Sequence, residues 1–286
     1  MIYIQSVGSL GRVENEVLDV KALWKAISPK MIRRTDRFIQ LSLLGANAAL
    51  EGRALSPHTA LYMASGQGNL AVFKRLRDQR YIHKQPPKPV DFINSLSNTA
   101  GFYVAQHFGI TGKNLNVSRL THVAETLLLL AQNDLELGRE KAVLLGGVDE
   151  LQEPFDFTRK TLGICDKTVL GEGSNWLLLS AQKEDALASV VYEKEIFTLE
   201  TLANYLSQEE RPYRYTFSQS SASLLQETVT PLLELQTAFD CSCGCGYYET
   251  AGLYIFAEFV REGQGTLLYI MTEGSNYRLI RIEIFS

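Results

Sequence analysis

The stretch that decides the fold runs Lys113-Asn-Leu-Asn-Val-Ser-Arg-Leu-Thr-His-Val-Ala-Glu-Thr-Leu-Leu-Leu-Leu-Ala131 and continues to Lys141-Ala-Val-Leu-Leu-Gly-Gly-Val-Asp-Glu150. Short apolar runs bounded by polar residues indicate strands, and a longer apolar segment indicates a buried helix. The pattern therefore predicts a strand, a tight elbow, a long apolar helix and a second, buried strand. Thr121 and His122 lie at the elbow, where the helix is expected to begin.

This layout resembles the nucleophile elbow of the β-ketoacyl synthases, in which a strand ends at a cysteine at the N-terminus of a buried helix. The matching position here is Thr121. A helix N-terminus favours the thiolate form of a cysteine, whereas a threonine hydroxyl needs an adjacent general base before it can attack. His122 is a poor candidate for that base, because consecutive helical side chains do not face each other.

Further segments resemble the same family, in the same order along the chain. They are an arginine-rich helix in 29–50, a strand and glycine loop in 59–69, a pocket and dimer-contact segment in 86–109, a glycine-glutamate-glycine turn and strand in 171–180, and a glycine-rich turn in 272–276. Strands also alternate with helices through the first 180 residues, which favours an α/β protein.

The resemblance implies a thiolase-like fold of five layers, α-β-α-β-α, with a shortened second half. Residues 1–186 resemble the N-terminal half of a β-ketoacyl synthase, and residues 187–286 resemble a shortened C-terminal half. We expect the two halves to pack as one structural unit.

The resemblance also identifies two further positions where chemistry would occur. The family uses two histidines to bind the malonyl carboxylate and the developing enolate oxyanion, a charge-stabilising role. Gln219 stands at the first position, and Gly246 stands at the second, in a loop that matches a glycine-histidine-x-x-glycine-alanine-alanine-glycine pattern. Since no histidine lies beyond His122, we expect no catalytic residue, with Thr121, Gln219 and Gly246 as degenerate positions.

Loss of three polar catalytic groups from a buried site leaves a space that side chains, water or a ligand must fill. The candidates for an acyl pocket at this place are Thr121, His122, Gln219, Tyr247 and Asn276. The bulky pair Tyr247 and Tyr248 favours filling by side chains. We therefore expect Thr121 to be buried against the segments around Gln219 and 244–248, with no open tunnel reaching it.

Three of the four cysteines, Cys241, Cys243 and Cys245, lie at alternate positions of one short segment. Structural zinc sites space their ligands differently, usually as C-x₂₋₄-C, and need a fourth ligand. We expect no metal and no cofactor, and regard these three cysteines as weak metal candidates. A redox or acyl-accepting thiol and simple tight packing are the other interpretations.

The strand before the elbow is expected at a subunit interface. In β-ketoacyl synthases this strand pairs with the same strand of a partner, and an exposed unpaired edge is a liability. The interface candidates are Asn114, Leu115, Asn116, Val117 and Ser118. The expected partner is an active ketosynthase in a heterodimer or a second copy in a homodimer, with an acyl carrier protein as a possible further partner.

The amino-acid composition restricts the class of protein to which the chain can belong. The 286 residues are 45% hydrophobic and 21% charged, with a net charge of −4, as in an ordinary globular protein without a nucleic-acid partner. No apolar run approaches the ~18–20 residues that cross a membrane. The N-terminus lacks the features of a signal peptide, so we expect a cytoplasmic location.

The leading functional interpretation is a pseudoenzyme: a non-catalytic, ketosynthase-like subunit of the chain-length-factor type. Such a subunit would partner an active β-ketoacyl synthase in fatty-acid, polyketide or aryl-polyene biosynthesis. Whether the chain is an enzyme on its own stays open, with the negative answer favoured. The alternatives are an acyltransferase or hydrolase that uses Thr121 or a thiol of 241–245, and a metal- or redox-sensing module.

Overall fold

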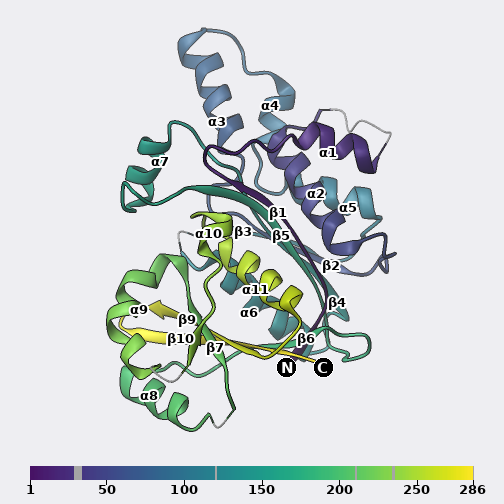
Figure 1. The fold of residues 1–286 in the computed structure, drawn as a ribbon. Helices are drawn as coiled ribbons and strands as arrows, with labels where there is room; N and C mark the ends of the chain where they lie inside the picture. Colours follow the sequence, from purple (N-terminus) through teal and green to yellow (C-terminus); the bar gives the residue numbers. More distant parts are fainter. Residues whose placement is uncertain (29–33, 120, 210, 234–235, 286) are drawn as a thin grey trace.

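The first half of the chain forms five strands of one sheet. The computed structural model describes residues 1–28, 34–119, 121–209, 211–233 and 236–285 (Figure 1). The strands are β1 (Ile2–Val13), β2 (Ala60–Ala64), β3 (Asn114–Val117), β4 (Ala142–Asp149) and β5 (Gly171–Ser180). They lie in the order β3-β2-β4-β5-β1. β2 runs parallel to β3 and β4, while β5 runs antiparallel to β4 and β1.

The second half repeats this pattern of pairing. Its strands are β6 (Ala188–Tyr192), β7 (Arg214–Phe217), β8 (Thr237–Ala238), β9 (Thr266–Glu273) and β10 (Asn276–Ile284), in the order β6-β10-β9-β7-β8. β7 runs parallel to β8 and β9, while β10 runs antiparallel to β9 and β6. The first strands of the two sets, β1 and β6, join them antiparallel over residues 2–4. The two sets of strands are therefore related by pseudo-symmetry.

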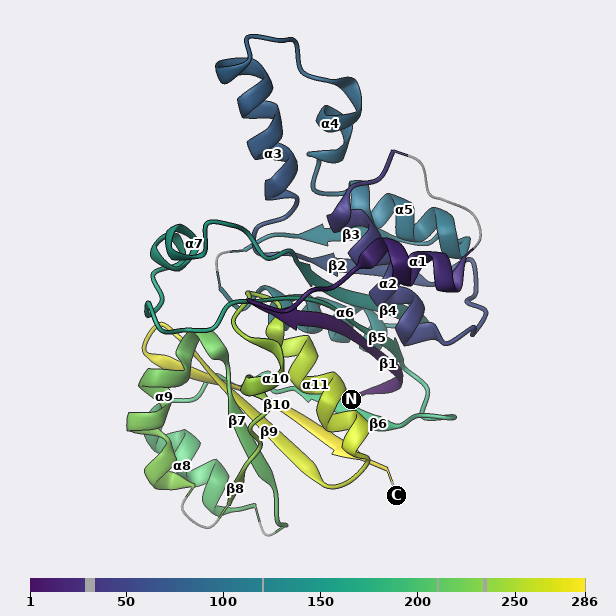
Figure 2. The same cartoon turned by 45° about the horizontal axis from the view of Figure 1, so that its top comes forward.

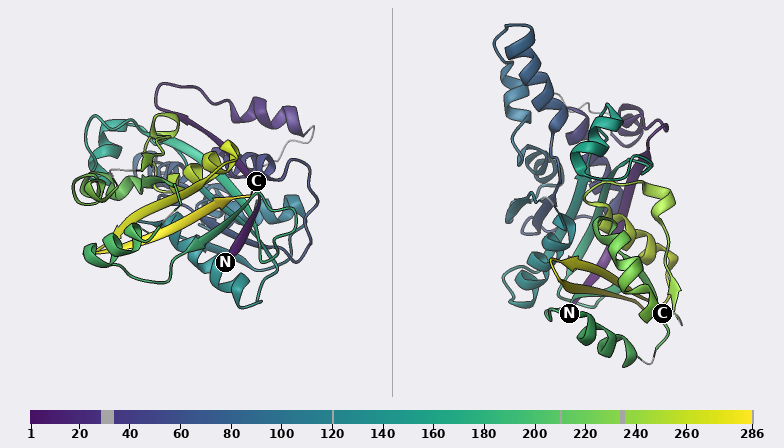
Figure 3. Two further views of the ribbon diagram at one scale, coloured as in Figure 1. Left: turned by 60° about the horizontal axis from the view of Figure 1, so that its bottom comes forward. Right: turned by 90° about the vertical axis from the view of Figure 1, so that its left-hand side faces the viewer.

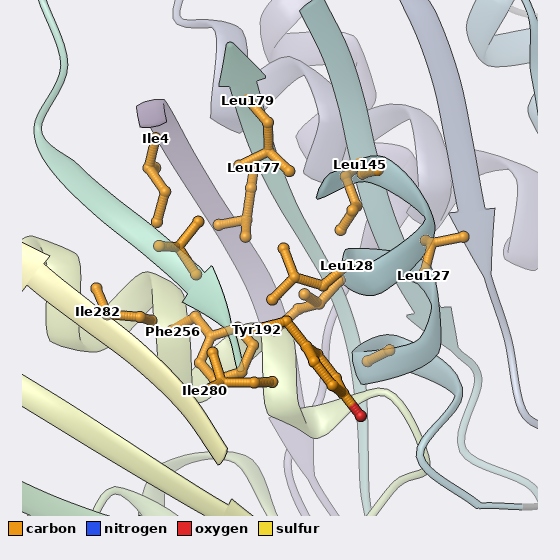
Figure 4. Packing of buried hydrophobic residues seen from close by; sticks show 14 of the residues in the cluster. Ile4, Leu127, Leu128, Leu145, Leu177, Leu179, Tyr192, Phe256, Ile280 and Ile282 are labelled. Carbon is orange, nitrogen blue, oxygen red and sulfur yellow. The ribbon is translucent and has the colours of Figure 1, made fainter. Parts of the chain in front are cut away.

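Two helices lie between the two sets of strands and form the central layer. They are α6 (Val123–Glu136) and α11 (Ala251–Glu262), which follow β3 and β8 respectively. Figure 4 shows their side chains packing between the strands. It labels Ile4, Leu127, Leu128, Leu145, Leu177, Leu179, Tyr192, Phe256, Ile280 and Ile282 of one buried cluster. The prediction of a buried helix is confirmed for α6, in which Leu127 and Leu128 are fully buried.

Other helices cover the outer faces. α1 (Val20–Ile27), α2 (Arg37–Leu50) and α5 (Thr99–Phe108) pack a second apolar cluster onto β2, β4 and β5. α8 (Leu199–Ser207) and α9 (Ala222–Thr228) pack a third cluster onto β9 and β10 (Figures 1 and 2). The layers therefore run α-β-α-β-α, and the expected thiolase-like fold is confirmed. All five strands of the second set fit within residues 188–284.

The remaining helical segments are short. α3 (Leu70–Arg77), the π-helical turn η1 (Asp78–Ile82) and α4 (Pro89–Asn94) form a hairpin that projects beyond the layers (Figure 3). α7 (Phe155–Leu162) follows β4, and α10 (Ser242–Cys245) precedes α11. Short 3-10 turns at Gln219–Ser221 and Thr230–Leu232 flank α9. Within the described ranges, every helix is too short or too polar to cross a bilayer.

The topology brings the predicted site residues together. β2, β3 and β4 are parallel, so their carboxyl ends open at one edge, where open α/β sheets usually place ligands. The elbow follows β3 at this edge, and Asp149 ends β4 there. In the second set, β7 ends at Phe217, and Gln219 lies two residues after this end. The site is therefore assembled from loops of both halves.

Candidate functional site

The elbow between β3 and α6 forms as the sequence predicts, with a left-handed residue at its end. His122 has φ +52° and is the N-cap residue of α6, although its side chain makes no capping hydrogen bond. Its Nε2 lies 2.7 Å from the carbonyl oxygen of Thr272, and its Nδ1 lies 3.5 Å from Ser218 Oγ. The imidazole is therefore tied to β9 and to the loop after β7. Both ring nitrogens of His122 thus have partners other than Thr121, so the imidazole is not placed to act as a base for Thr121.

Gln219 and Gly246 contact each other directly. Gln219 Nε2 donates to the carbonyl oxygen of Gly246 over 2.8 Å, and the Cys245 thiol donates weakly to the same oxygen over 3.2 Å. Gly246 has φ +66°, and a Cβ added there would lie 2.8 Å from the backbone of Leu170 and Gly171. No side chain fits at position 246 without movement of this backbone, so a histidine is sterically excluded there.

Two tyrosines follow Gly246 and fill the region beneath the elbow. Tyr248 is buried, and its hydroxyl accepts a hydrogen bond from Asn175 Nδ2 over 2.9 Å. Tyr247 is half-buried and is held by its backbone, which bonds to Val169 and Gly171. Burial raises the pKa of the Tyr247 hydroxyl to about 12. Both phenols are therefore neutral at physiological pH. Each fills space with its apolar ring and carries a polar hydroxyl at the end.

Three carboxyl groups converge on the same place. Glu125, in the first turn of α6, is buried and accepts a hydrogen bond from the Tyr269 hydroxyl. Asp149 is buried and accepts from Ser65 Oγ, Gly66 N and Thr250 N over 2.8–2.9 Å. Burial, and then the charge of Asp149, raises the pKa of Glu249 to about 7. Oε2 of Glu125 and Oε2 of Glu249 have no hydrogen-bond partner among the described residues.

The elbow and the loops after β7 and before α11 line a small cavity and a larger cleft. The cavity has a volume of about 20 Å³, room for a single water molecule, and the open cleft beside it about 930 Å³. The residues that line both are Thr121, Gln219, Ser220, Tyr247 and Glu249. The cleft extends between residues 162–169 and 219–224, with Leu162, Ile164, Val169 and Leu224 among its walls. The structure thus brings four of the five pocket candidates together, since His122 lines the cavity.

Two expectations about this region are wrong. Thr121 is exposed rather than buried, because the cleft remains open to solvent beside it. Asn276 begins β10 in the β9–β10 hairpin and is not one of the described residues that line the cavity or the cleft. The tyrosines fill the space beneath the elbow but leave its outer side uncovered.

The strand before the elbow lies at the end of the sheet. β3 comprises Asn114–Val117, and within the described residues it pairs only with β2. Leu115 and Val117 pack against the central cluster, while the side chains of Asn114 and Asn116 bond to each other over 3.0 Å. Ser118 follows the strand, is exposed, and donates to the carbonyl oxygen of Ser65. One edge of β3 is thus available for pairing with another chain.

The cysteine segment shows no sign of activated thiols where it is described. Cys245 is buried and Cys241 is half-buried, and burial raises the pKa of both thiols to about 12. A thiol with such a pKa is almost entirely protonated at neutral pH. The side chain of Cys243 lies outside the described part of the structure. Among the described side chains, no group of three or more histidine, cysteine or acidic residues is placed to hold a metal ion.

The carboxyl groups of Glu125, Asp149 and Glu249 were not predicted from the sequence. Two signals could have found them. Glu125 interrupts an apolar helix on its buried face, which usually marks a polar contact. Glu249 stands where the loop pattern around Gly246 calls for its second glycine. Both place acidic groups beside a site that resembles an anion-stabilising one.

Comparisons with known proteins agree with this geometry. The family model described as "Beta-ketoacyl synthase, N-terminal domain" matches residues 5–161. No curated protein sequence matches the chain with significance.

Solved structures match over the whole chain. The ishigamide ketosynthase/chain length factor superposes with a TM-score of 0.76 at 12% identity, covering 100% of this chain and 99% of that one. A type II PKS acyl-carrier protein in complex with its ketosynthase gives 0.68 at 12% identity, covering 99% of each chain. The ketosynthase ApeO with its chain length factor ApeC from Xenorhabdus doucetiae gives 0.54 at 12% identity, covering 98% of each. At such identities the likeness shows a shared fold.

Proposed function

This chain belongs to the β-ketoacyl synthase family, and we propose that it acts there as a non-catalytic, chain-length-factor-type partner of an active ketosynthase. The proposed setting is fatty-acid, polyketide or aryl-polyene biosynthesis. The observation that supports the proposal is the hydrogen bond between Gln219 and Gly246, the two residues that the resemblance assigns to the positions of the family's histidines.

The chemistry of condensation explains why this contact matters. Condensation needs a nucleophile to hold the acyl group and hydrogen-bond donors for the developing enolate oxyanion. Thr121 offers a hydroxyl, and His122 is tied to Thr272 and Ser218. The Gln219 amide hydrogen bonds are directed at the Gly246 carbonyl and the Cys245 thiol. At these positions the chain therefore offers no thiol to hold the acyl group, and the donors of His122 and Gln219 are already engaged.

Electrostatics supports the same proposal. Glu125 and Glu249 line the cavity, and Asp149 lines a smaller space beside Glu249; among the described residues no lysine or arginine lines the cavity or the cleft. A malonyl carboxylate approaching Thr121 would meet like charge in a partly desolvated place, where repulsion is stronger than in water. An anionic extender unit is therefore disfavoured, whereas an uncharged acyl chain along the apolar wall of the cleft is not.

The partner role draws on the edge of β3. A strand edge with unpaired backbone groups is a ready site for strand addition, and β3 offers one beside the elbow. We propose that an active ketosynthase pairs with this edge. An acyl carrier protein would then deliver acyl groups to that ketosynthase; one of the similar solved structures is itself a complex of an acyl-carrier protein with its ketosynthase.

The test is reconstitution. The isolated protein is incubated with acyl- and malonyl-loaded carrier protein, and products are detected by mass spectrometry. No condensation product is expected from the chain alone. Addition of a cysteine-containing ketosynthase recovered with it from the native host should give product, and omission of the chain should change the chain lengths formed. Turnover by the isolated chain would overturn the proposal.

A second candidate is favoured by one observation, the exposure of Thr121 in an open cleft. It is an acyltransferase or hydrolase in which Thr121 accepts an acyl group. The thiols of Cys241 and Cys245 are poor alternatives, because burial keeps them protonated. Covalent labelling with an acyl-thioester or cerulenin-type probe distinguishes the candidates. A mass increase that maps to Thr121, and is lost in Thr121→Ala, would establish this second function.

A further inference from the structure

Two serines and a histidine beside the elbow form a series of contacts that the proposed function does not use. Ser220 Oγ lies 2.9 Å from Ser218 Oγ, and Ser218 Oγ lies 3.5 Å from Nδ1 of His122. On the other side of the ring, His122 Nε2 lies 2.7 Å from the carbonyl oxygen of Thr272. A serine becomes a nucleophile when an imidazole takes its proton, so this series has the parts that acyl transfer needs.

The contact with Thr272 fixes the tautomer of His122. A carbonyl oxygen only accepts hydrogen bonds, so Nε2 of the neutral imidazole carries the proton and Nδ1 offers its lone pair. Ser218 then donates to Nδ1 and accepts from Ser220, since each hydroxyl donates one hydrogen. The contact between Ser218 and His122 is long, as catalytic contacts often are before a substrate binds. The proton of Ser220 therefore has a path to His122.

β9 positions both ends of this series. The N–H of Ser218 donates to the carbonyl oxygen of Ile270 over 2.9 Å, and Thr272 Oγ1 donates to Ser221 Oγ over 2.9 Å. β7, which leads into the serine loop, also pairs with β9 (Figure 1). His122 is held at φ +52°, a conformation that few residues other than glycine adopt. Such conformations cluster where the position of a side chain matters for function.

Ser220 lies where the small cavity meets the open cleft. Ser218 and His122 line the cavity, whereas Ser220 lines both the cavity and the cleft and is exposed. The apolar wall of the cleft suits a hydrocarbon chain, and the acidic groups beside the cavity disfavour an anionic one. The hydroxyl of Ser220 is thus accessible to a substrate in the cleft, while the imidazole lies behind it.

We propose that Ser220 accepts the acyl group of an uncharged acyl thioester and that the chain hydrolyses this thioester. Ser220 Oγ attacks the carbonyl carbon while its proton passes through Ser218 to His122 Nδ1. The tetrahedral intermediate expels the thiolate, which takes up that proton and leaves as a thiol. A water molecule from the open cleft then attacks the ester on Ser220 and gives its proton to the same relay. The carboxylic acid leaves as Ser220 regains its proton.

This activity goes beyond the proposed function and is separate from it. Hydrolysis consumes an acyl thioester and water, and it needs no malonyl carboxylate, no enolate and no protein thiol. A chain that does not condense acyl groups can therefore still release them. The activity also differs from acyl transfer by Thr121, because Nδ1 of His122 contacts Ser218 instead.

The test uses the full chain, the octanoyl thioester of N-acetylcysteamine as substrate, and a fluorophosphonate probe that labels activated serines. Ser220→Ala removes the nucleophile. His122→Asn removes the base but keeps a side-chain donor and a residue that tolerates positive φ. Ser218→Ala interrupts the relay, whereas Ser218→Thr retains a hydroxyl.

The matched control is Ser207→Ala. Ser207 is exposed at the end of α8 and is not among the described residues that line the cavity or the cleft. Thiol release measures activity, mass spectrometry locates the label, and circular dichroism checks the fold of every variant.

The unmodified chain should release thiol, and the probe should label Ser220. Ser220→Ala should lose the label and at least about 10²-fold in kcat/KM, whereas Ser207→Ala should stay within about twofold. His122→Asn and Ser218→Ala should lose about 10²-fold or more in kcat with little change in KM, as loss of a general base does. Ser218→Thr should recover at least about tenfold in kcat over Ser218→Ala. A packing role alone would not give this recovery, because threonine adds a methyl group at a buried position.

Absence of thiol release by the folded, unmodified chain overturns the inference, and so does activity that survives Ser220→Ala. A label that maps to Thr121 and is lost in Thr121→Ala overturns it in favour of the second candidate function. Ser220→Ala keeps the test decisive if the variants of buried Ser218 do not fold, since Ser220 is exposed. Reconstitution with an active ketosynthase tests the proposed function independently of these results.

Discussion

Gln219 Nε2 donates a hydrogen bond to the carbonyl oxygen of Gly246 over 2.8 Å, and this bond joins the loop after β7 to the loop before α11. The resemblance to the family assigns both residues to positions where a histidine would stand, and here the two residues bond to each other. The amide satisfies a buried carbonyl, and the absence of a side chain at Gly246 lets the loop lie against Leu170 and Gly171. The pair has a structural role in place of a chemical one.

Restoring the nucleophile alone should not restore condensation. Thr121→Cys supplies a thiol at the elbow, but Gln219 and Gly246 provide no free donors for the oxyanion. Loss of one such donor in an enzyme costs about 10²–10³ in rate. Mass spectrometry of acyl and malonyl carrier mixtures should show no ketoacyl product from Thr121→Cys, as from the Thr121→Ala control. Product from Thr121→Cys alone would mean that other groups stabilise the oxyanion.

Removal of the Gln219 amide should destabilise the protein modestly. Gln219→Ala leaves the Gly246 carbonyl with only the weak Cys245 thiol as a donor. An under-satisfied buried acceptor of this kind costs ~1 kcal/mol. Urea denaturation should show this loss, whereas the exposed Gln106→Ala serves as a control with little effect. Equal midpoints for the two variants would contradict the structural role of the pair.

Steric exclusion at position 246 can be separated from backbone strain. Gly246→Ala combines a positive φ with a Cβ only 2.8 Å from backbone atoms, whereas Gly138→Ala has φ +67° and open space around it. The strained conformation alone costs about 1–3 kcal/mol, so Gly138→Ala measures that part. Gly246→Ala should lower the free energy of unfolding by at least ~1 kcal/mol more. If the two losses were equal, the backbone around Leu170 would be able to yield.

The raised pKa of Glu249 should make stability depend on pH. Its carboxyl titrates near 4.5 when unfolded and about 7 when folded, so the folded state binds more protons between these values. The stabilisation that the Glu249 carboxyl contributes is fully present below pH ~4.5. It is lost as the pH rises to about 7, so the free energy of unfolding falls by roughly 1–3 kcal/mol over this range. Glu249→Gln should flatten the unfolding free energy across this window, while exposed Glu195→Gln should not. An unchanged slope in Glu249→Gln would show that Glu249 titrates normally.

The sequence predicted those features that depend on local pattern. The stretch 113–150 became β3, the elbow, α6 and β4, because each element is set by its own apolar periodicity. The acidic groups depended on contacts across the chain: Glu125 is bonded by Tyr269, 144 residues away. The exposure of Thr121 was equally hidden, since it depends on where α7 and α9 leave the cleft open. A local sequence pattern does not specify contacts between segments that lie so far apart in the chain.

The outward edge of β3 should be testable without damage to the fold. In a parallel ladder alternate residues bond to the neighbouring strand. The carbonyl oxygens of Lys113 and Val117 accept from the N–H groups of Leu61 in β2 and of Ser65 directly after it, so the backbone of Asn116 faces away from β2. Asn116→Pro removes an outward N–H, which a pairing strand would need, and leaves the contacts with β2 in place.

Asn116→Pro should therefore keep the thermal unfolding midpoint within a few degrees of the unmodified protein but weaken assembly with the ketosynthase about tenfold or more. Val117→Pro is the contrasting variant, because it removes a donor on the β2 side and a side chain packed in the core; it should lower the unfolding midpoint itself. Light scattering measures assembly and circular dichroism measures folding. Full assembly by a folded Asn116→Pro variant would contradict strand addition at β3, because proline cannot donate the outward N–H that such pairing uses.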